Sequence, residues 1–80
     1  MSADEMLYGI DELIRQFSAP TREITPASKF REDLDMDSLT TIELFTAAER
    51  RFGVVIPDEE VGSINTVGEL RDFVARATAS

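Results

Sequence analysis

The sequence predicts an all-α fold, a small irregular four-helix bundle with three main helices, a short third helix and a long loop between helices one and two. Two observations support this class. Apolar residues recur at helical spacing in three segments, and capping sequences precede two of those segments. A further apolar run, residues 54–56, is too short for a helix and has no partner strand, so we expect a buried loop there.

The first helix is expected from Ser2 to about Phe17. Ser2 and Glu5 form a capping box, in which a serine and a glutamate three residues on can satisfy the free amides of a helix start. Behind this box lies a helical stripe of apolar residues: Met6, Leu7, Ile10, Leu13, Ile14 and Phe17.

A long irregular connection follows, which Pro20 and Pro26 enforce. Within it we expect residues 28–33 to form a helical turn that places Phe30 and Leu34 inward. A connection of this length favours a crossover between helices that are not simple antiparallel neighbours.

The second helix is expected from Ser38 to Phe52, with Gly53 as the residue that ends it. Its core face is a row of residues four apart: Leu44, Ala48 and Phe52. Leu39 and Ile42 lie on a neighbouring stripe beside Ser38, and we expect both to be partly exposed.

Two shorter elements complete the bundle. Pro57 suits the first position of a short third helix, because the acids that follow it complement the helix dipole in the first turn. Thr66 and Glu69 form a second capping box and open the last helix. One stripe of that helix holds Val67, Leu70, Phe73, Val74 and Ala77.

Composition excludes several functions. Eighty residues make one small domain whose core is too modest to enclose a full enzyme site. The chain has no cysteine and no histidine, which removes thiolate metal sites and a Ser-His-Asp triad, so we expect no catalytic residue and no metal centre. A net charge of −8 excludes nucleic-acid binding. No apolar run could span a membrane and no leader is recognisable, so we expect a cytoplasmic monomer.

Asp37-Ser38-Leu39 is the candidate site. An acidic, aperiodic loop precedes this serine and an apolar pair follows it, which presents the hydroxyl to solvent for modification by another protein. The simpler alternative is that Asp37 or Ser38 only caps the second helix.

Acidic side chains surround this serine and the start of the third helix. No base stands between Glu32 and Glu49. A patch of one sign destabilises the fold by repulsion, so a role in recognising basic partners explains it better than chance, although each acid alone could be ordinary solvated surface. The patch comprises Asp35, Asp37, Glu43, Glu49, Asp58, Glu59 and Glu60.

Two other types of site fail on their spacing. Residues 33–44 begin like a calcium-binding loop, but Ser38 and Leu44 stand where that loop needs a glycine and a bidentate glutamate. Only loose binding of divalent cations remains. A serine hydrolase is excluded because the chain has neither a Gly-x-Ser-x-Gly elbow nor a histidine.

The chain resembles the acyl carrier proteins, the discrete carriers of dissociated fatty-acid and polyketide synthesis. The resemblance covers most of the chain and is strongest over residues 30–74. There five segments match the family in order and spacing: Asp37-Ser38-Leu39, Ile42-Glu43-Leu44, Phe52, Ile56-Pro57-Asp58-Glu59 and Thr66-Val67-Gly68.

The resemblance implies one carrier domain over residues 1–80. A phosphopantetheinyl transferase, using coenzyme A and magnesium, would attach 4′-phosphopantetheine to Ser38 through a phosphodiester. The arm would end in the molecule's only thiol, since the chain has no cysteine, and would carry acyl groups as thioesters. The carrier would catalyse nothing and would deliver its cargo to successive enzymes.

The resemblance also assigns surrounding residues. Asp37 and Leu39 would frame the attachment site. Partners would be the transferase, an acyltransferase or acyl-carrier synthetase, a ketosynthase and other synthase enzymes. Their basic surfaces would contact Ile42, Glu43, Glu49, Asp58, Glu59 and Glu60. The acyl chain would be sheltered in a pocket lined by some of Leu44, Phe45, Ile56, Val61 and Ile64.

The sequence departs from the family pattern near the site. Asp35-Met36 stands where many fatty-acid carriers have Gly-Ala or Gly-Leu, a variant similar to actinobacterial-type carriers. Thr40, Arg50 and Arg51 dilute the acidic face, which favours a polyketide or other specialised pathway, although both arginines also suit the helix dipole. Two alternatives stay open: a peptidyl carrier of a nonribosomal pathway, and an acidic helical adaptor that is never modified.

Overall fold

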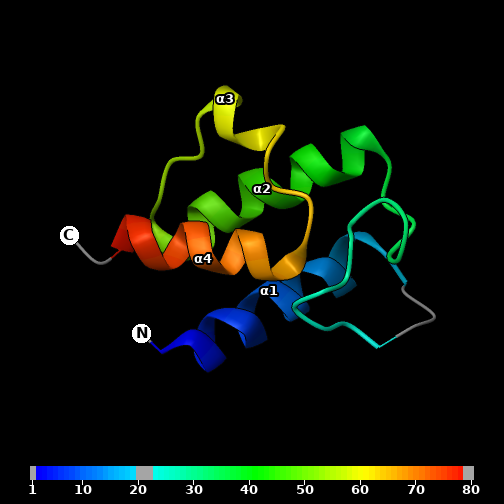
Figure 1. Cartoon of the computed structure of the whole chain (residues 1–80), viewed down its shortest axis with the longest axis horizontal. Helices are drawn as coiled ribbons and strands as arrows, with labels where there is room; N and C mark the ends of the chain where they lie inside the picture. The colour runs from blue at the N-terminus through cyan, green and yellow to red at the C-terminus, as the bar shows by residue number, and fades with distance from the viewer. Residues whose placement is uncertain (1, 20–22, 79–80) are drawn as a thin grey trace.

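The computed structural model describes residues 2–19 and 23–78, and within them it contains four helices and no strand (Figure 1). The helices are α1 (Ala3–Phe17), α2 (Ser38–Phe52), α3 (Asp58–Val61) and α4 (Val67–Thr78). α1 packs against both α2 and α4. The predicted bundle, with its long connection between α1 and α2, is confirmed. Pro20, which we expected to shape that connection, lies outside the described residues.

The core draws on all three main helices and on the connections between them. Phe30 from the long loop meets Phe45 of α2 edge to face, with ring centroids 5.7 Å apart. The buried hydrophobic residues are Met6, Ile10, Leu13, Ile14, Phe30, Leu34, Met36, Leu44, Phe45, Ala48, Val54, Ile56, Ile64, Val67, Leu70 and Val74. The long loop therefore contributes buried side chains to the core, as the main helices do.

The long loop turns inward as predicted. The Asp33 amide donates to the Lys29 carbonyl at 2.9 Å, which closes one helical turn. Phe30 and Leu34 are each 1% exposed, so the turn delivers both side chains to the core.

Main-chain hydrogen bonds fasten the loop to the start of α4. The Phe30 amide donates to the Asn65 carbonyl at 3.1 Å, and the Val67 amide donates to the Ser28 carbonyl at 3.0 Å. The Gly68 amide donates to the Pro26 carbonyl at 2.8 Å. These bonds satisfy polar groups that would otherwise be buried without partners, which lets an irregular segment lie against the bundle.

Helix ends follow the capping sequences. The Ser2 hydroxyl accepts the Glu5 amide at 3.2 Å, and at α4 the exchange is reciprocal, since Thr66 and Glu69 each accept the other's amide. α2 ends at Gly53, whose φ of 68° lies in the left-handed region. The predicted bounds of α1 and α2 are confirmed.

Three local predictions are wrong. Pro57 has an extended ψ of 151° and precedes α3 as its cap, so the helix begins at Asp58. Val55 is 76% exposed, because its extended backbone turns it outward while Val54 and Ile56 turn inward. Ala77 is exposed, because the part of α4 that packs on the bundle ends with Ala75.

The loop's contact with α4 depends on a glycine, which gives a first prediction. A Cβ at position 68 would lie 2.9 Å from the Pro26 carbonyl oxygen. Gly68→Ala should therefore lower the free energy of unfolding in urea by about 1–3 kcal/mol, the usual effect of overpacking. In an exposed helix the same change would instead stabilise by about 1 kcal/mol.

Gly62→Ala is the matched control, because a Cβ there meets nothing within 4 Å. Its effect should stay within about 0.5 kcal/mol. A Gly68→Ala protein as stable as this control would show that the close approach of loop and helix is not needed.

Candidate functional site

Ser38 is the first residue of α2, and its side chain is exposed. Asp37, not Ser38, caps the helix: its carboxylate accepts the Thr40 amide at 2.8 Å. The Thr41 hydroxyl donates to the Asp37 carbonyl at 2.8 Å and reinforces the same turn. The capping alternative is therefore true of Asp37, while the Ser38 hydroxyl is left out of the cap.

The backbone before Ser38 is held by the core. Leu34 and Met36 are 1% and 2% exposed, and the Met36 amide donates to the Phe30 carbonyl at 2.9 Å. Between them, Asp35 takes a φ of 53°, in the left-handed region that favours glycine. Met36 was missed as a core residue in the sequence, because no periodic pattern includes it.

Arg31 also lies at the site, although no sequence pattern predicted it there. Its guanidinium donates a hydrogen bond to the Ser38 hydroxyl oxygen. The turn after Lys29 brings Arg31 back beside the start of α2, although it precedes Ser38 by seven residues. The sequence feature that could have indicated Arg31 is its positive charge within a mostly acidic segment.

Asp37 is held in its charged form. The hydrogen bond from the Thr40 amide is the main reason that the pKa of the Asp37 carboxyl is lowered, and the Thr40 side chain adds to it. Desolvation opposes them and raises this pKa, while the positive charge of Arg31 and the Leu39 amide lower it by lesser amounts. Arg31 thus acts on both residues at the start of α2.

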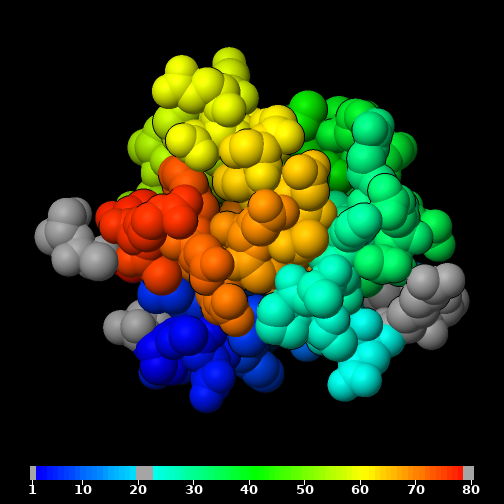
Figure 2. Space-filling view, in the orientation of Figure 1, coloured from blue at the N-terminus to red at the C-terminus, as the bar shows by residue number. Residues whose placement is uncertain are grey.

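A groove of about 320 Å³ opens beside Ser38. It is lined by Phe30, Arg31, Ser38, Thr41, Ile42, Val61, Gly62, Ile64 and Asn65. A second groove of about 240 Å³ shares Ile42 and Val61 with it and continues along α2, lined also by Phe45, Thr46, Glu49, Ile56 and Asp58. Figure 2 shows that the surface of the long loop adjoins the surfaces of α4 and of the segment that joins α3 to α4.

The predicted acyl-pocket residues divide between these grooves. Ile64 lines the first, Phe45 and Ile56 line the second, and Val61 lines both. Leu44 lines neither, because it is 0% exposed and belongs to the core.

The predicted partner-binding residues lie on α2 and α3. Leu39 and Ile42 are 67% and 53% exposed next to Ser38, as expected. Glu43, Asp58 and Glu59 are exposed and Glu60 is half-buried. The structure brings Ile42, Glu49 and Asp58 together around the second groove.

Glu49 also has a structural partner. Its carboxylate accepts the Ile56 amide at 2.7 Å, and the side chain is half-buried. This bond holds the segment between α2 and α3 against α2. No sequence pattern predicts this hydrogen bond, because Glu49 and Ile56 come together only through the chain reversal after Gly53.

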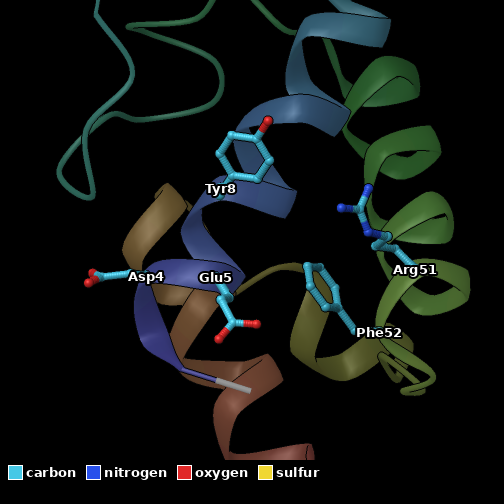
Figure 3. A pocket seen from close by; sticks show the side chains of 5 residues that line it. All are labelled: Asp4, Glu5, Tyr8, Arg51 and Phe52. Carbon is cyan, nitrogen blue, oxygen red and sulfur yellow. The ribbon is translucent and has the colours of Figure 1, made fainter.

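A third groove, of about 350 Å³, lies between α1 and the end of α2 (Figure 3). It is lined by Asp4, Glu5, Tyr8, Arg51 and Phe52. Arg51 pairs with Glu12 at 2.7 Å. This groove contains none of the residues predicted for the site.

The start of α2 presents a hydroxyl and a guanidinium together at one groove. An exposed hydroxyl stands at the edge of an open groove, with a guanidinium beside the oxygen where a phosphate would be attached, so these residues fit a phosphopantetheine arm. Among residues 2–19 and 23–78, no group of three acidic, cysteine or histidine side chains could hold a metal ion. In that same part of the chain, every helix is too short or too polar to cross a membrane.

The lowered pKa of Asp37 gives a second prediction. A folded-state pKa below the ordinary value of 3.8 means that the carboxylate stabilises the fold fully above that value and loses this effect as the pH falls through the lowered pKa. The difference in melting temperature between the parent and Asp37→Ala should therefore be constant near neutral pH and shrink in strong acid. Carbon-13 NMR of the Asp37 side chain measures the pKa directly, and a midpoint at or above the ordinary value would contradict the cap.

The backbone of Asp35 gives a third prediction. Asp35→Gly and Asp35→Ala both remove the carboxylate, but only glycine adopts a positive φ without strain. The glycine variant should be more stable than the alanine variant by about 1 kcal/mol in urea unfolding. An alanine variant of equal or greater stability would mean that the loop does not need this conformation.

Comparison with known proteins identifies the family. The family model described as "phosphopantetheine attachment site" matches residues 10–74. The chain is 44% identical to the acyl carrier protein of Acidothermus cellulolyticus over 81 aligned positions, which cover 100% of this chain and 96% of that relative. It is 40% identical to the acyl carrier protein of an Arthrobacter species over 79 positions, which cover 98% of each chain.

Solved structures agree with this assignment. The Toxoplasma-specific mitochondrial acyl carrier protein superposes with a TM-score of 0.84 at 30% identity, covering 99% of this chain and 93% of that one. The acyl carrier protein of Enterococcus faecalis superposes with a TM-score of 0.80 at 26% identity, covering 98% and 100%. By sequence over its full length and by its fold, this chain belongs to the acyl carrier protein family, whose members carry acyl groups on a covalently attached 4′-phosphopantetheine.

Proposed function

We propose that Ser38 is the attachment residue and that residues 1–80 act as a single cytoplasmic carrier domain. The observation that carries this proposal is the state of the Ser38 hydroxyl, which is exposed at the first turn of α2 and left out of the helix cap. Its neighbours Asp37 and Leu39 frame it, the first by fixing the helix start and the second by presenting an exposed apolar side chain.

In the attachment reaction, the Ser38 oxygen forms a bond to the phosphorus of the pantetheine phosphate in coenzyme A. The bond from that phosphorus to the adenosine bisphosphate part breaks, and the hydroxyl proton leaves to a base. This chain has no histidine, and the Asp37 carboxylate next to Ser38 is occupied in capping α2, where it accepts the Thr40 amide. We therefore assign the base and the magnesium ion to the phosphopantetheinyl transferase, and regard the carrier as a substrate and not an enzyme.

We assign recognition of partner enzymes to the exposed faces of α2 and α3. Leu39 and Ile42 supply apolar contact, and the acidic residues Glu43, Glu49, Asp58, Glu59 and Glu60 supply attraction to basic surfaces. The partners are the transferase, an acyltransferase or acyl-carrier synthetase, a ketosynthase and other synthase enzymes. Glu49 contributes only in part, because the Ile56 amide occupies one carboxylate oxygen.

The cargo proposed is an acyl group of the fatty-acid or polyketide type. The two grooves along α2 are lined by apolar side chains and offer shelter to such a chain. One relative, 35% identical over 77 residues, is the meromycolate extension acyl carrier protein of Mycobacterium leprae, a carrier named for extending an acyl chain. The relatives described here are acyl carriers, so a peptidyl carrier is the less favoured alternative.

Intact mass spectrometry tests the attachment. The protein is incubated with coenzyme A, magnesium and a broad-specificity phosphopantetheinyl transferase, beside Ser38→Ala and the matched control Ser63→Ala, which removes another exposed serine. The parent and the control should each gain one phosphopantetheine and one titratable thiol, and Ser38→Ala should gain neither. Loading of a folded Ser38→Ala protein would contradict the assignment, and an unloaded parent would favour the unmodified adaptor.

A further inference from the structure

Arg31 lies at the site, and the proposed carrier function does not explain it. It is exposed, and among the residues that the structure describes it forms no salt bridge with a carboxylate. Its neighbour Lys29, by contrast, pairs with Glu32 at 3.3 Å. The guanidinium of Arg31 instead donates to a neutral hydroxyl, that of Ser38. The Arg31 guanidinium, a strong cationic donor, therefore contacts the Ser38 oxygen that we propose is modified.

We propose that Arg31 forms an anion subsite for the phosphodiester that joins the arm to Ser38. The inference rests on the proposed attachment at Ser38. In that phosphodiester the Ser38 oxygen becomes a bridging atom, and the charged oxygens are bound to the phosphorus next to it. A guanidinium that already reaches the bridging oxygen has these charged oxygens within its range. The planar fork of arginine suits paired donation to a phosphate.

The electrostatics of the site favour this pairing. Attachment adds a negative charge beside the Asp37 carboxylate, which is itself held ionised by its cap. Arg31 already stabilises the ionised form of Asp37, and from the same position it would offset the repulsion between Asp37 and the phosphodiester. No acidic residue stands in the first turn of α2, so the helix dipole adds attraction there.

The position of Arg31 is set by the core and not by its own surface contacts. Phe30, the preceding residue, is 1% exposed and stacks edge to face on Phe45. The turn that follows is closed by the Lys29 carbonyl. The backbone at Arg31 is therefore fixed relative to α2, and only its side chain must be ordered to bind an anion.

The subsite would also set the direction of the phosphopantetheine arm. Arg31 and Ser38 both line the first groove, together with the apolar side chains of Ile42, Val61 and Ile64. A phosphodiester paired with Arg31 would start the arm along this groove. Arg31 is thus a positioning residue for the arm, with no part in forming the bond.

Phosphorus-31 NMR of the loaded protein tests the subsite. The comparison is between the parent, Arg31→Gln and Arg50→Gln, a control that removes the same charge from the far end of α2. We expect the phosphodiester resonance to shift in Arg31→Gln and to stay in place in Arg50→Gln. Raising the salt to about 1 M, where charges are screened beyond about 3 Å, should move the parent resonance toward that of Arg31→Gln and leave that variant unchanged.

The outcomes separate this inference from the proposed function. Identical phosphorus spectra for all three loaded proteins would overturn the subsite while leaving attachment at Ser38 intact. An equal shift in both variants would also overturn it, since net charge alone would then be responsible. Failure of the parent to gain any mass would instead refute the proposed function before the spectra are compared.

Discussion

The packing of the long loop into the bundle is the constraint on which the rest of the structure depends. Phe30 enters the core against Phe45, and main-chain bonds tie the loop to the start of α4. The packed loop gives this small domain more apolar area to bury than its helices alone would provide, which matters because short chains have modest cores.

The same packing presents the site. Leu34 and Met36 point into the core, so the residues between and after them face solvent, and Asp37 reaches the position from which it caps α2. Ser38 therefore sits on a rigid helix start and not on a mobile loop. Arg31 is placed by the same turn, which explains how a residue seven positions away meets the Ser38 hydroxyl. The contacts that pack the loop into the core therefore also position Ser38 and Arg31.

Local rules made much of this predictable from sequence. Caps and periodicity predicted the extent of α1 and α2, and the exposed position of Ser38 at the start of α2 followed from its place between an acidic loop and an apolar stripe. Val55 was misplaced because its exposure depends on how segments pack in three dimensions. Arg31 was missed for a related reason: only the folded turn brings it to Ser38, and a base within a mostly acidic segment does not by itself indicate a contact seven residues away.

Amide hydrogen exchange tests most directly whether the loop is part of the folded core. The informative amides are those of Phe30, Met36 and Val67, which donate to carbonyls of the loop and the segment before α4. Protection comparable to that of buried amides in α1 and α2 is expected, because these bonds should open only with the whole domain. Exchange as fast as that of an exposed loop residue such as Val55 would show that the loop opens independently, and that the placement of Ser38 does not depend on it.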